Sequence, residues 1–343
     1  MNLMVKFPLK KSINFLLIFF AGSSLMANAR ELTEFNWLAT ESAPADYPMQ
    51  IMRGGSFRYH GAENDGLYIP SGGTLYQGWG NAISTHAVGP ALKPLPDKLD
   101  ITFYSYLEDV FYQGSFDLPY AKILSLFREG VAVDANSPVY NRVMVGIAPG
   151  GTVAVWVSGK KTVEVFFGKA HKADLSWGKV MNYPENERAE FVKRRQEEAV
   201  EPEVLAAIRK NGIHFNQWAN FRTQYQWVPT FIAGKTPKHT NVVYFNGEND
   251  RLLLPLEESV AADTRPVPMR LSFNSLMKGE TEADVFIIHF DEAETFAAFA
   301  KLGSKQESLH FEFEPKLPKS ATKVRLCNGK ESIQLTKWTI EEW

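Results

Sequence analysis

Two acidic tripeptides are the clearest candidates for chemistry in this sequence. Glu63-Asn64-Asp65 and Glu248-Asn249-Asp250 each place side-chain oxygens at successive positions, and Ca²⁺ accepts such ligands. Neither tripeptide has the glycine and the later glutamate that a calcium-binding loop requires. We therefore interpret both as solvated Asx-type turns, and we predict no metal site and no cofactor.

The sequence contains none of the catalytic motifs that we sought. It has no G-x-S-x-G nucleophile elbow and no H-E-x-x-H, and its seven histidines never stand four residues apart. His86 lies near Ser84 and Asp97, but closeness along the chain does not make a catalytic triad. We predict no catalytic residues and a protein that is not an enzyme.

Aromatic residues gather in two stretches, 68–80 and 215–227. Core packing is one interpretation of both. Exposed aromatic anchors on loops are the other, because binding hot spots use such residues. The second interpretation gives these candidate partner-binding residues: Tyr68, Tyr76, Trp79, His86, Trp218 and Trp227.

An internal repeat organises the chain around these residues. Four motifs recur in the same order, at spacings of 170 to 185 residues. The shared order favours a tandem duplication, although turn-forming residues that recur by chance are the alternative. The paired segments are Tyr59–Pro70 with Tyr244–Pro255, Pro94–Leu99 with Pro266–Leu271, Asp109–Asp117 with Asp284–Asp291, and Val157–Lys160 with Cys327–Lys330.

Each copy predicts one helix followed by β-hairpins. Pro119–Arg128 and Glu292–Lys301 have the apolar spacing of amphipathic helices, with Gly130 and Gly303 placed as C-terminal caps. Alternating β-branched residues follow each helix, and Asn328-Gly329 is typical of a type I′ hairpin turn. The predicted fold class is α+β, mainly β: two tandem modules, each a mostly antiparallel sheet with a packed helix.

The predicted domains follow from this repeat. Residues 30–235 form the first, with a helical segment at 184–211 and an aromatic tail at 215–227. Residues 236–343 form the second, diverged copy, and a linker falls near 233–241.

The first 29 residues are predicted to be a cleavable signal peptide. A basic start precedes the short apolar run Ile13–Ala21, and Ala27-Asn28-Ala29 ends it as a cleavage site. An uncleaved N-terminal anchor is the alternative. Cleavage after Ala29 removes three of the 37 basic residues and none of the 39 acidic ones, which leaves a net charge of −5. Such a chain is a poor candidate for binding nucleic acid or anionic membranes. Cys327, the single cysteine, cannot form an intramolecular disulfide.

The segment from Ile147 to Gly159 resembles a known family. Its most specific part is the sequence Pro-Gly-Gly-x-Val-x-Val-Trp. Together with the strand pair 99–116 and the segment 208–218, this run resembles the bacterial envelope proteins called DUF2931, over roughly residues 35–228. Members are commonly small lipoproteins, and some are encoded beside type VI secretion phospholipase effectors, where they resemble immunity proteins. This chain departs by lacking a lipid-attachment cysteine and by carrying a second copy. The resemblance supplies no catalytic residues.

These observations predict a periplasmic protein that binds a protein partner. The expected activity is that of an immunity protein, which neutralises a type VI phospholipase effector by occluding it. The alternatives are a periplasmic envelope or small-ligand-binding protein without enzymatic activity, and an enzyme of unrecognised type. We expect no nucleic-acid partner and no stable membrane anchor.

Overall fold

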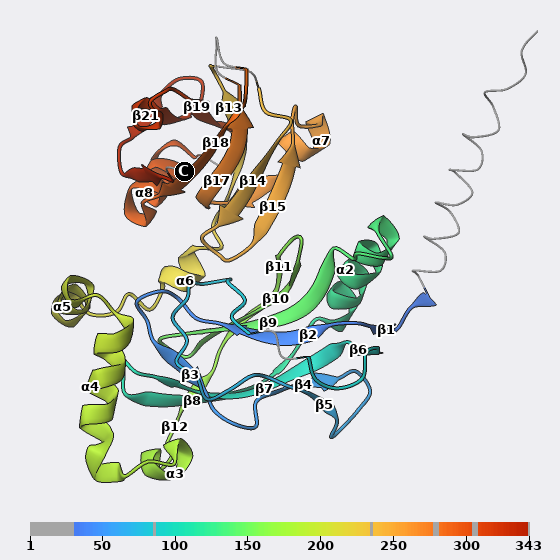
Figure 1. Cartoon of the computed structure of the whole chain (residues 1–343), viewed down its shortest axis with the longest axis vertical. Coiled ribbons are helices and arrows are strands. Elements are labelled where there is room, and N and C mark those ends of the chain that lie inside the picture. The colour runs from blue at the N-terminus through green and yellow to red at the C-terminus, as the bar shows by residue number, and fades with distance from the viewer. Residues whose placement is uncertain (1–30, 85–86, 234–235, 277–280, 304–307, 342–343) are drawn as a thin grey trace, which may run out of the picture.

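Two modules lie end to end along the long axis of the molecule (Figure 1). The computed structural model describes residues 31–84, 87–233, 236–276, 281–303 and 308–341. The predicted signal peptide and His86 therefore lie outside the described residues.

The first module is a sandwich of two sheets, with a short strand pair beside them. The pair consists of β1 (Glu34–Phe35) and β6 (Lys93–Pro94). Sheet I has the order β12 (His171–Ala173), β8 (Val110–Asp117), β7 (Pro96–Ser105), β4 (Ser56–Tyr59) and β5 (Gly66–Tyr68), with β3 (Met49–Ile51) also pairing with β7. Sheet II has the order β11 (Val163–Lys169), β10 (Thr152–Gly159), β9 (Tyr140–Ala148) and β2 (Leu38–Ser42).

The second module is also built from two sheets. Sheet III has the order β15 (Asn249–Leu253), β14 (His239–Tyr244), β17 (Pro268–Ser275), β18 (Asp284–Phe290) and β22 (Trp338–Ile340). Sheet IV has the order β16 (Thr264–Pro266), β13 (Gln224–Phe231), β19 (Leu309–Glu314), β20 (Lys323–Cys327) and β21 (Ser332–Leu335).

The two modules follow the same path through space. Sheet I is matched by sheet III and sheet II by sheet IV, down to one parallel pair in each module, β2 with β9 and β13 with β19. The prediction of a mainly β, α+β fold in two tandem modules is confirmed. The prediction of a single sheet per module is wrong, because the hairpins after each helix form a second sheet that faces the first.

The helices follow the predicted positions with one correction. The helix of the first module, α2 (Tyr120–Val133), continues past Gly130, which is buried in the helix against Tyr140 and is not its cap. The helix of the second module, α8 (Glu292–Leu302), does end at Gly303. Among the described residues, the other helices are α3 (Trp177–Met181), α4 (Arg188–Ala199), α5 (Pro202–Asn211), α6 (Gln217–Asn220), α7 (Glu258–Ala261) and the 3₁₀ turns η1 (Glu185–Glu187) and η2 (Lys319–Ala321).

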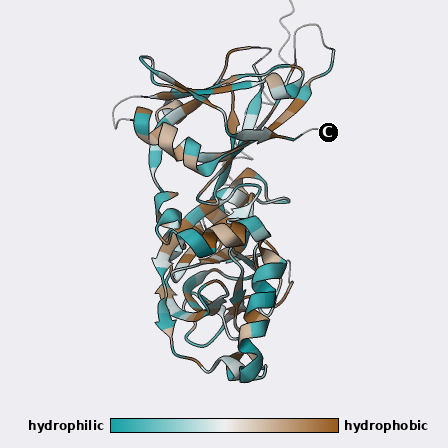
Figure 2. Cartoon of the chain, turned by 90° about the vertical axis from the view of Figure 1, so that its left-hand side faces the viewer, coloured by the Kyte–Doolittle hydropathy of each residue, from teal (hydrophilic) through white to brown (hydrophobic). Residues whose placement is uncertain are grey.

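The segment α3 to α5 forms a helical appendix on the first module. Figure 2 views the molecule from this side. Trp177 and Val192 anchor the appendix in a small core with Tyr104 of β7 and Tyr106 of the turn that follows β7. Within the described residues, no helix is long and apolar enough to cross a membrane.

Strand β10 shows why sheet II is buried on both faces. Val153, Val155 and Val157 point into the core of the first module, whereas Ala154 and Trp156 belong to a second core that continues into the second module. This follows from the two-residue period of a strand. The strand reads as an uninterrupted apolar run because both of its faces are covered.

Each module contains the same arrangement of one tryptophan and one cation, which we call the tryptophan clasp. The repeat motifs predicted only its Pro-x-Pro segment. The Trp37 indole N–H donates to the Pro94 carbonyl (3.1 Å), and the Lys93 ammonium donates to the Trp37 carbonyl (2.8 Å). In the second module the Trp227 indole donates to the Pro266 carbonyl (3.1 Å), and the Arg265 guanidinium donates to the Trp227 carbonyl (3.1 Å). The first clasp joins the residue before β2 to the Pro-x-Pro segment of its module, and the second clasp joins β13 to the equivalent segment.

The junction between the modules begins at the turn between β14 and β15. The Trp156 indole donates to the Asn246 carbonyl (3.1 Å), and Asn249 forms an antiparallel bridge with Thr162. Gly80 and Gly247 approach so closely that a Cβ on Gly80 would stand 2.3 Å from the Gly247 Cα. The structure also pairs β13 into sheet IV, so the chain passes between the modules near α6 and not at the predicted linker, 233–241.

A partly buried ion pair lies at the same junction. The Arg222 Nε lies 2.7 Å from the Glu164 Oε1, and the Arg222 guanidinium stacks on the Phe167 ring at 3.3 Å. The backbone N–H of Glu164 donates to the Glu248 Oε1 (2.8 Å). Residue 164 therefore holds both the α6 segment and the second module.

The burial of Glu164 predicts a pH dependence of stability. Burial raises the pKa of Glu164 to about 7, against the opposing attraction of Arg222. The folded chain then binds this proton more tightly than the unfolded chain, so this group makes the free energy of unfolding increase as the pH falls from about 8 to 5. We expect a contribution on the order of 1–3 kcal/mol, which Glu164→Gln removes. Urea unfolding across this pH range measures it, and an unchanged slope in the variant contradicts it.

Candidate functional site

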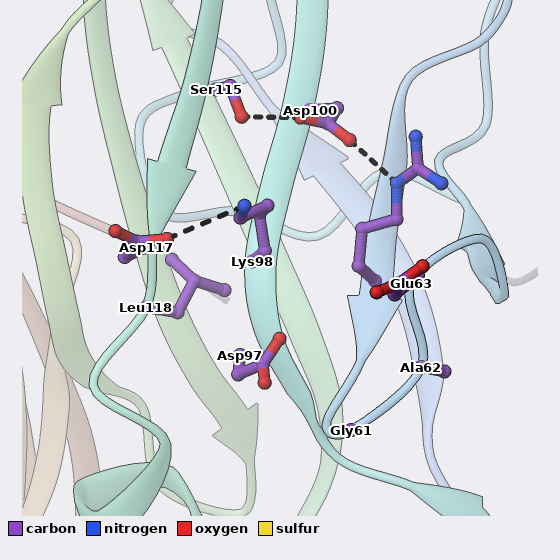
Figure 3. Close-up of a pocket in the computed structure, with 10 residues that line it drawn as sticks. Gly61, Ala62, Glu63, Asp97, Lys98, Asp100, Ser115, Asp117 and Leu118 are labelled. Carbon is purple, nitrogen blue, oxygen red and sulfur yellow. Dashed lines mark hydrogen bonds and ion pairs between the residues drawn. The ribbon is translucent and has the colours of Figure 1, made fainter.

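A charged groove runs across the exposed face of sheet I (Figure 3). It encloses about 780 Å³ and is formed by β4, β7, β8 and the turn after β4. The lining residues are Arg58, Gly61, Ala62, Glu63, Asp97, Lys98, Asp100, Ser115, Asp117 and Leu118.

Asp100 lies at the centre of the charge network in this groove. Its two oxygens accept from the Arg58 Nε and the Ser115 Oγ, each at 2.6 Å. Burial opposes ionisation, but these two hydrogen bonds and the Arg58 charge hold the pKa of Asp100 below its usual value. A second pair joins the Lys98 Nζ to the Asp117 Oδ1 at 3.8 Å, and the Asp117 side chain is 93% exposed. The groove therefore offers charges of both signs to solvent.

A histidine and a carboxylate lie beside the groove. The His60 Nδ1 lies 2.7 Å from the Asp97 Oδ2, and the His60 ring stacks on Tyr120 with centroids 3.6 Å apart. Ser115, the hydroxyl of the groove, donates to Asp100 and not to His60. The nucleophile–base contact of acyl transfer is thus not formed by this hydroxyl.

The structure places the neighbours of His86 elsewhere. Asp97 pairs with His60, and the Ser84 Oγ donates to the Glu41 Oε2 at 2.9 Å. His86 itself is outside the described residues.

Of the predicted partner-binding residues that the structure describes, two are exposed, on different parts of the first module. Tyr68, 49% exposed, stands opposite Ser56 on sheet I, and Ser56 stands opposite Asp100 on its other side, so Tyr68 shares the face of the groove. Tyr76, 36% exposed, lies in a loop that is held next to the end of β2, because the Gly78 N–H donates to the carbonyl of Ala43, the residue after β2. Tyr68 lies on β5 and Tyr76 lies in a loop, so no strand carries both tyrosines.

The three predicted tryptophans belong to the core and not to an exposed surface. Trp79, Trp218 and Trp227 are 8%, 1% and 0% exposed. Trp79 packs edge-on against Trp156 at the junction, Trp218 against Tyr47, and Trp227 forms the clasp of the second module. The expectation of exposed anchors is wrong for them, because Trp79 and Trp218 lie in the core that joins the outer face of sheet II to the second module, and Trp227 lies inside the second module.

The repeated acidic tripeptides cap backbone amides. The Asp65 carboxylate accepts from the Gly66 N–H and the Asp250 carboxylate from the Arg251 N–H, both at 2.8 Å. Glu248 contributes to the junction. Among the described residues, no group of three or more histidine, cysteine or acidic side chains is arranged to hold a metal ion.

Glu63 and Asp97 of the charged groove were singled out from the sequence, but its central residues on β7 and β8 were not. Lys98 and Asp100 on β7, and Ser115 and Asp117 on β8, are two residues apart, which places each pair on one face of its strand. This alternation was visible in the sequence. The pairing of β7 with β8, which sets Asp100 opposite Ser115, comes from the fold.

Among the known proteins compared with this chain, only a family model matches it. Neither the curated proteins nor the solved structures include a match to the chain. The family model described as a protein of unknown function, DUF2931, matches residues 24–234, which include every strand of the charged groove. The chain therefore belongs to the DUF2931 family.

Proposed function

We propose that this protein is a periplasmic binding protein that neutralises a secreted toxin by occluding it. The expected toxin is a phospholipase-type effector of type VI secretion. The signal-peptide pattern of residues 1–29 supports export. The family resemblance supports the immunity role.

The charged groove is the observation that carries the proposal. Complementary charges across an interface steer the encounter of two proteins and reject wrong partners. The groove has four acidic side chains, Glu63, Asp97, Asp100 and Asp117, against the two cations Arg58 and Lys98. We therefore expect the partner to present a surface with more basic than acidic groups.

A protection assay tests the function. A phospholipase-type effector of type VI secretion is expressed in the periplasm with and without the full protein, and survival is counted. We expect survival only with the protein. Equal killing in both strains rejects the proposal.

A charge reversal tests the groove separately. Asp117→Lys changes a side chain that is 93% exposed, so the fold is retained while the charge that faces the partner is inverted. We expect association with the toxin to slow by about tenfold at low salt. Glu331→Lys, in an exposed turn of the second module, is the matched control and should associate as the wild type does. Equal rates for both variants would exclude the groove.

A small-ligand-binding protein of the envelope, without enzymatic activity, is the second candidate. The apolar cleft described next favours it, because ligand sites combine apolar walls with a few polar groups.

A further inference from the structure

A second cleft lies between the helical appendix and the end of sheet I. It encloses about 540 Å³, within the range of pockets that hold small ligands. We call it the appendix cleft. Its lining residues are Leu107, Glu108, Val110, Lys172, Gln196, Leu205, Ile208, Arg209, Gly212, Ile213 and Phe215.

Apolar side chains from three segments form the walls. Leu205 and Ile208 stand three residues apart on one face of α5, and Leu107 and Val110 flank the turn between β7 and β8. Phe215 closes the cleft from the chain after α5 and is 42% exposed. A large aromatic ring left half in solvent beside aliphatic walls is suited to contact an apolar ligand.

The Pro149-Gly150-Gly151 turn of the family motif supports this wall. A Cβ on Gly150 would stand 2.8 Å from the Phe215 ring, so glycine leaves room for that ring. The Gly150 N–H also donates to the Glu108 Oε2 at 3.0 Å. The motif that best marks the family thus positions two residues of the cleft.

The polar groups of the cleft favour an anion. Glu108, the one acid of the lining, has both oxygens hydrogen-bonded, since its other oxygen accepts from the Tyr112 hydroxyl at 2.6 Å. Arg209 donates to the Gln196 side chain at 3.1 Å and forms no ion pair with any described residue, and neither does Lys172. Lys172 and Arg209 therefore bring two positive charges to the cleft against the one negative charge of Glu108.

We infer that the appendix cleft binds an anionic amphiphile with a single alkyl chain. The walls take the alkyl chain, and Lys172 and Arg209 take the carboxylate or phosphate headgroup. This inference is independent of the proposed toxin partner, since it concerns another face of the first module.

Titration calorimetry of the full protein with dodecanoate, kept below its micelle concentration, tests the site. We expect saturable binding with one site, and much weaker binding of acetate and of dodecyl maltoside, which lack the chain and the charge respectively. Lys172→Ala combined with Arg209→Ala should weaken dodecanoate binding by about tenfold. Phe215→Ser should weaken it through the apolar wall.

Lys210→Ala is the matched control, because Lys210 neighbours Arg209 on α5 but does not line the cleft. It should bind dodecanoate as the wild type does, and circular dichroism should show every variant folded. Absence of dodecanoate binding overturns the inference. Equal binding of dodecyl maltoside, or an equal loss in Lys210→Ala, also overturns it.

Discussion

Replacing Trp227 with alanine should lower the free energy of unfolding by about 3–5 kcal/mol. The indole is fully buried, donates to the Pro266 carbonyl, and meets Tyr244, Phe299 and Phe311 edge-on. Alanine leaves a cavity among these rings and an unpaired buried carbonyl. Urea unfolding, followed by circular dichroism, measures the loss.

Three further variants separate the causes of this loss. Trp37→Ala should cost a similar amount, because Trp37 occupies the equivalent clasp of the first module. Trp227→Phe keeps a ring but removes the N–H donor, and it should cost about 1–3 kcal/mol. Trp338→Ala, at a partly exposed position, should cost less than Trp227→Ala. If Trp227→Ala unfolded like the wild type, Trp227 would be free for partner contact and not part of the core.

The clasp shows what the repeat in the sequence could and could not reveal. The Pro-x-Pro segments were visible as a repeated pair, at Pro94 and Pro266. The tryptophans that bind them lie 57 and 39 residues away, at different separations in the two copies. A comparison by constant offset therefore cannot find them, whereas the shared topology does.

Local sequence patterns predicted the positions of the strands better than they predicted which strands pair with one another. The hairpin strands after each helix were found because alternation and turn residues are local signals. The parallel pairs, β2 with β9 and β13 with β19, join segments far apart in the chain, and no local signal announces them. This is why one sheet per module was expected where two exist, and why β13 was assigned to the first domain.

The aromatic residues illustrate the same limit. Density of tryptophan and tyrosine in a glycine-rich stretch is compatible with both a core and a binding surface. The outcome depended on the second module, which covers Trp79 and Trp218. Tyr68 stays exposed because it lies on sheet I, whose outer face is polar.

The outer faces of sheets II and IV differ, and this difference explains why the second module packs on sheet II and no further module packs on sheet IV within the described residues. Sheet II presents apolar residues, Met144, Ala154 and Trp156, which the second module covers. At the equivalent face of sheet IV, Glu312 and Arg325 form an ion pair at 3.0 Å. A charged face of this kind ends a stack, as the polar outer face of a terminal repeat does. The second module therefore acts as a cap on the first.

Gly80→Ala should separate the two modules at their junction. Gly80 has a φ of +79°, and its Cβ would stand 2.3 Å from the Gly247 Cα and 2.6 Å from its carbonyl oxygen. Backbone cannot yield as a side-chain end does, so the turn between β14 and β15 must retreat from sheet II. We expect a cost of about 1–2 kcal/mol for the left-handed backbone and a further 1–3 kcal/mol for the clash.

Gly72→Ala isolates the effect of the contact. Gly72 has a φ of +97° and nothing within 4 Å of its Cβ position, so alanine there carries only the backbone cost. Scanning calorimetry should show the modules of Gly80→Ala unfolding in separate transitions, and small-angle scattering should show a larger radius of gyration. Gly72→Ala should retain the wild-type profile at a slightly lower temperature. If both variants lost the same stability and kept one transition, the approach of Gly80 to Gly247 would not be what holds the modules together.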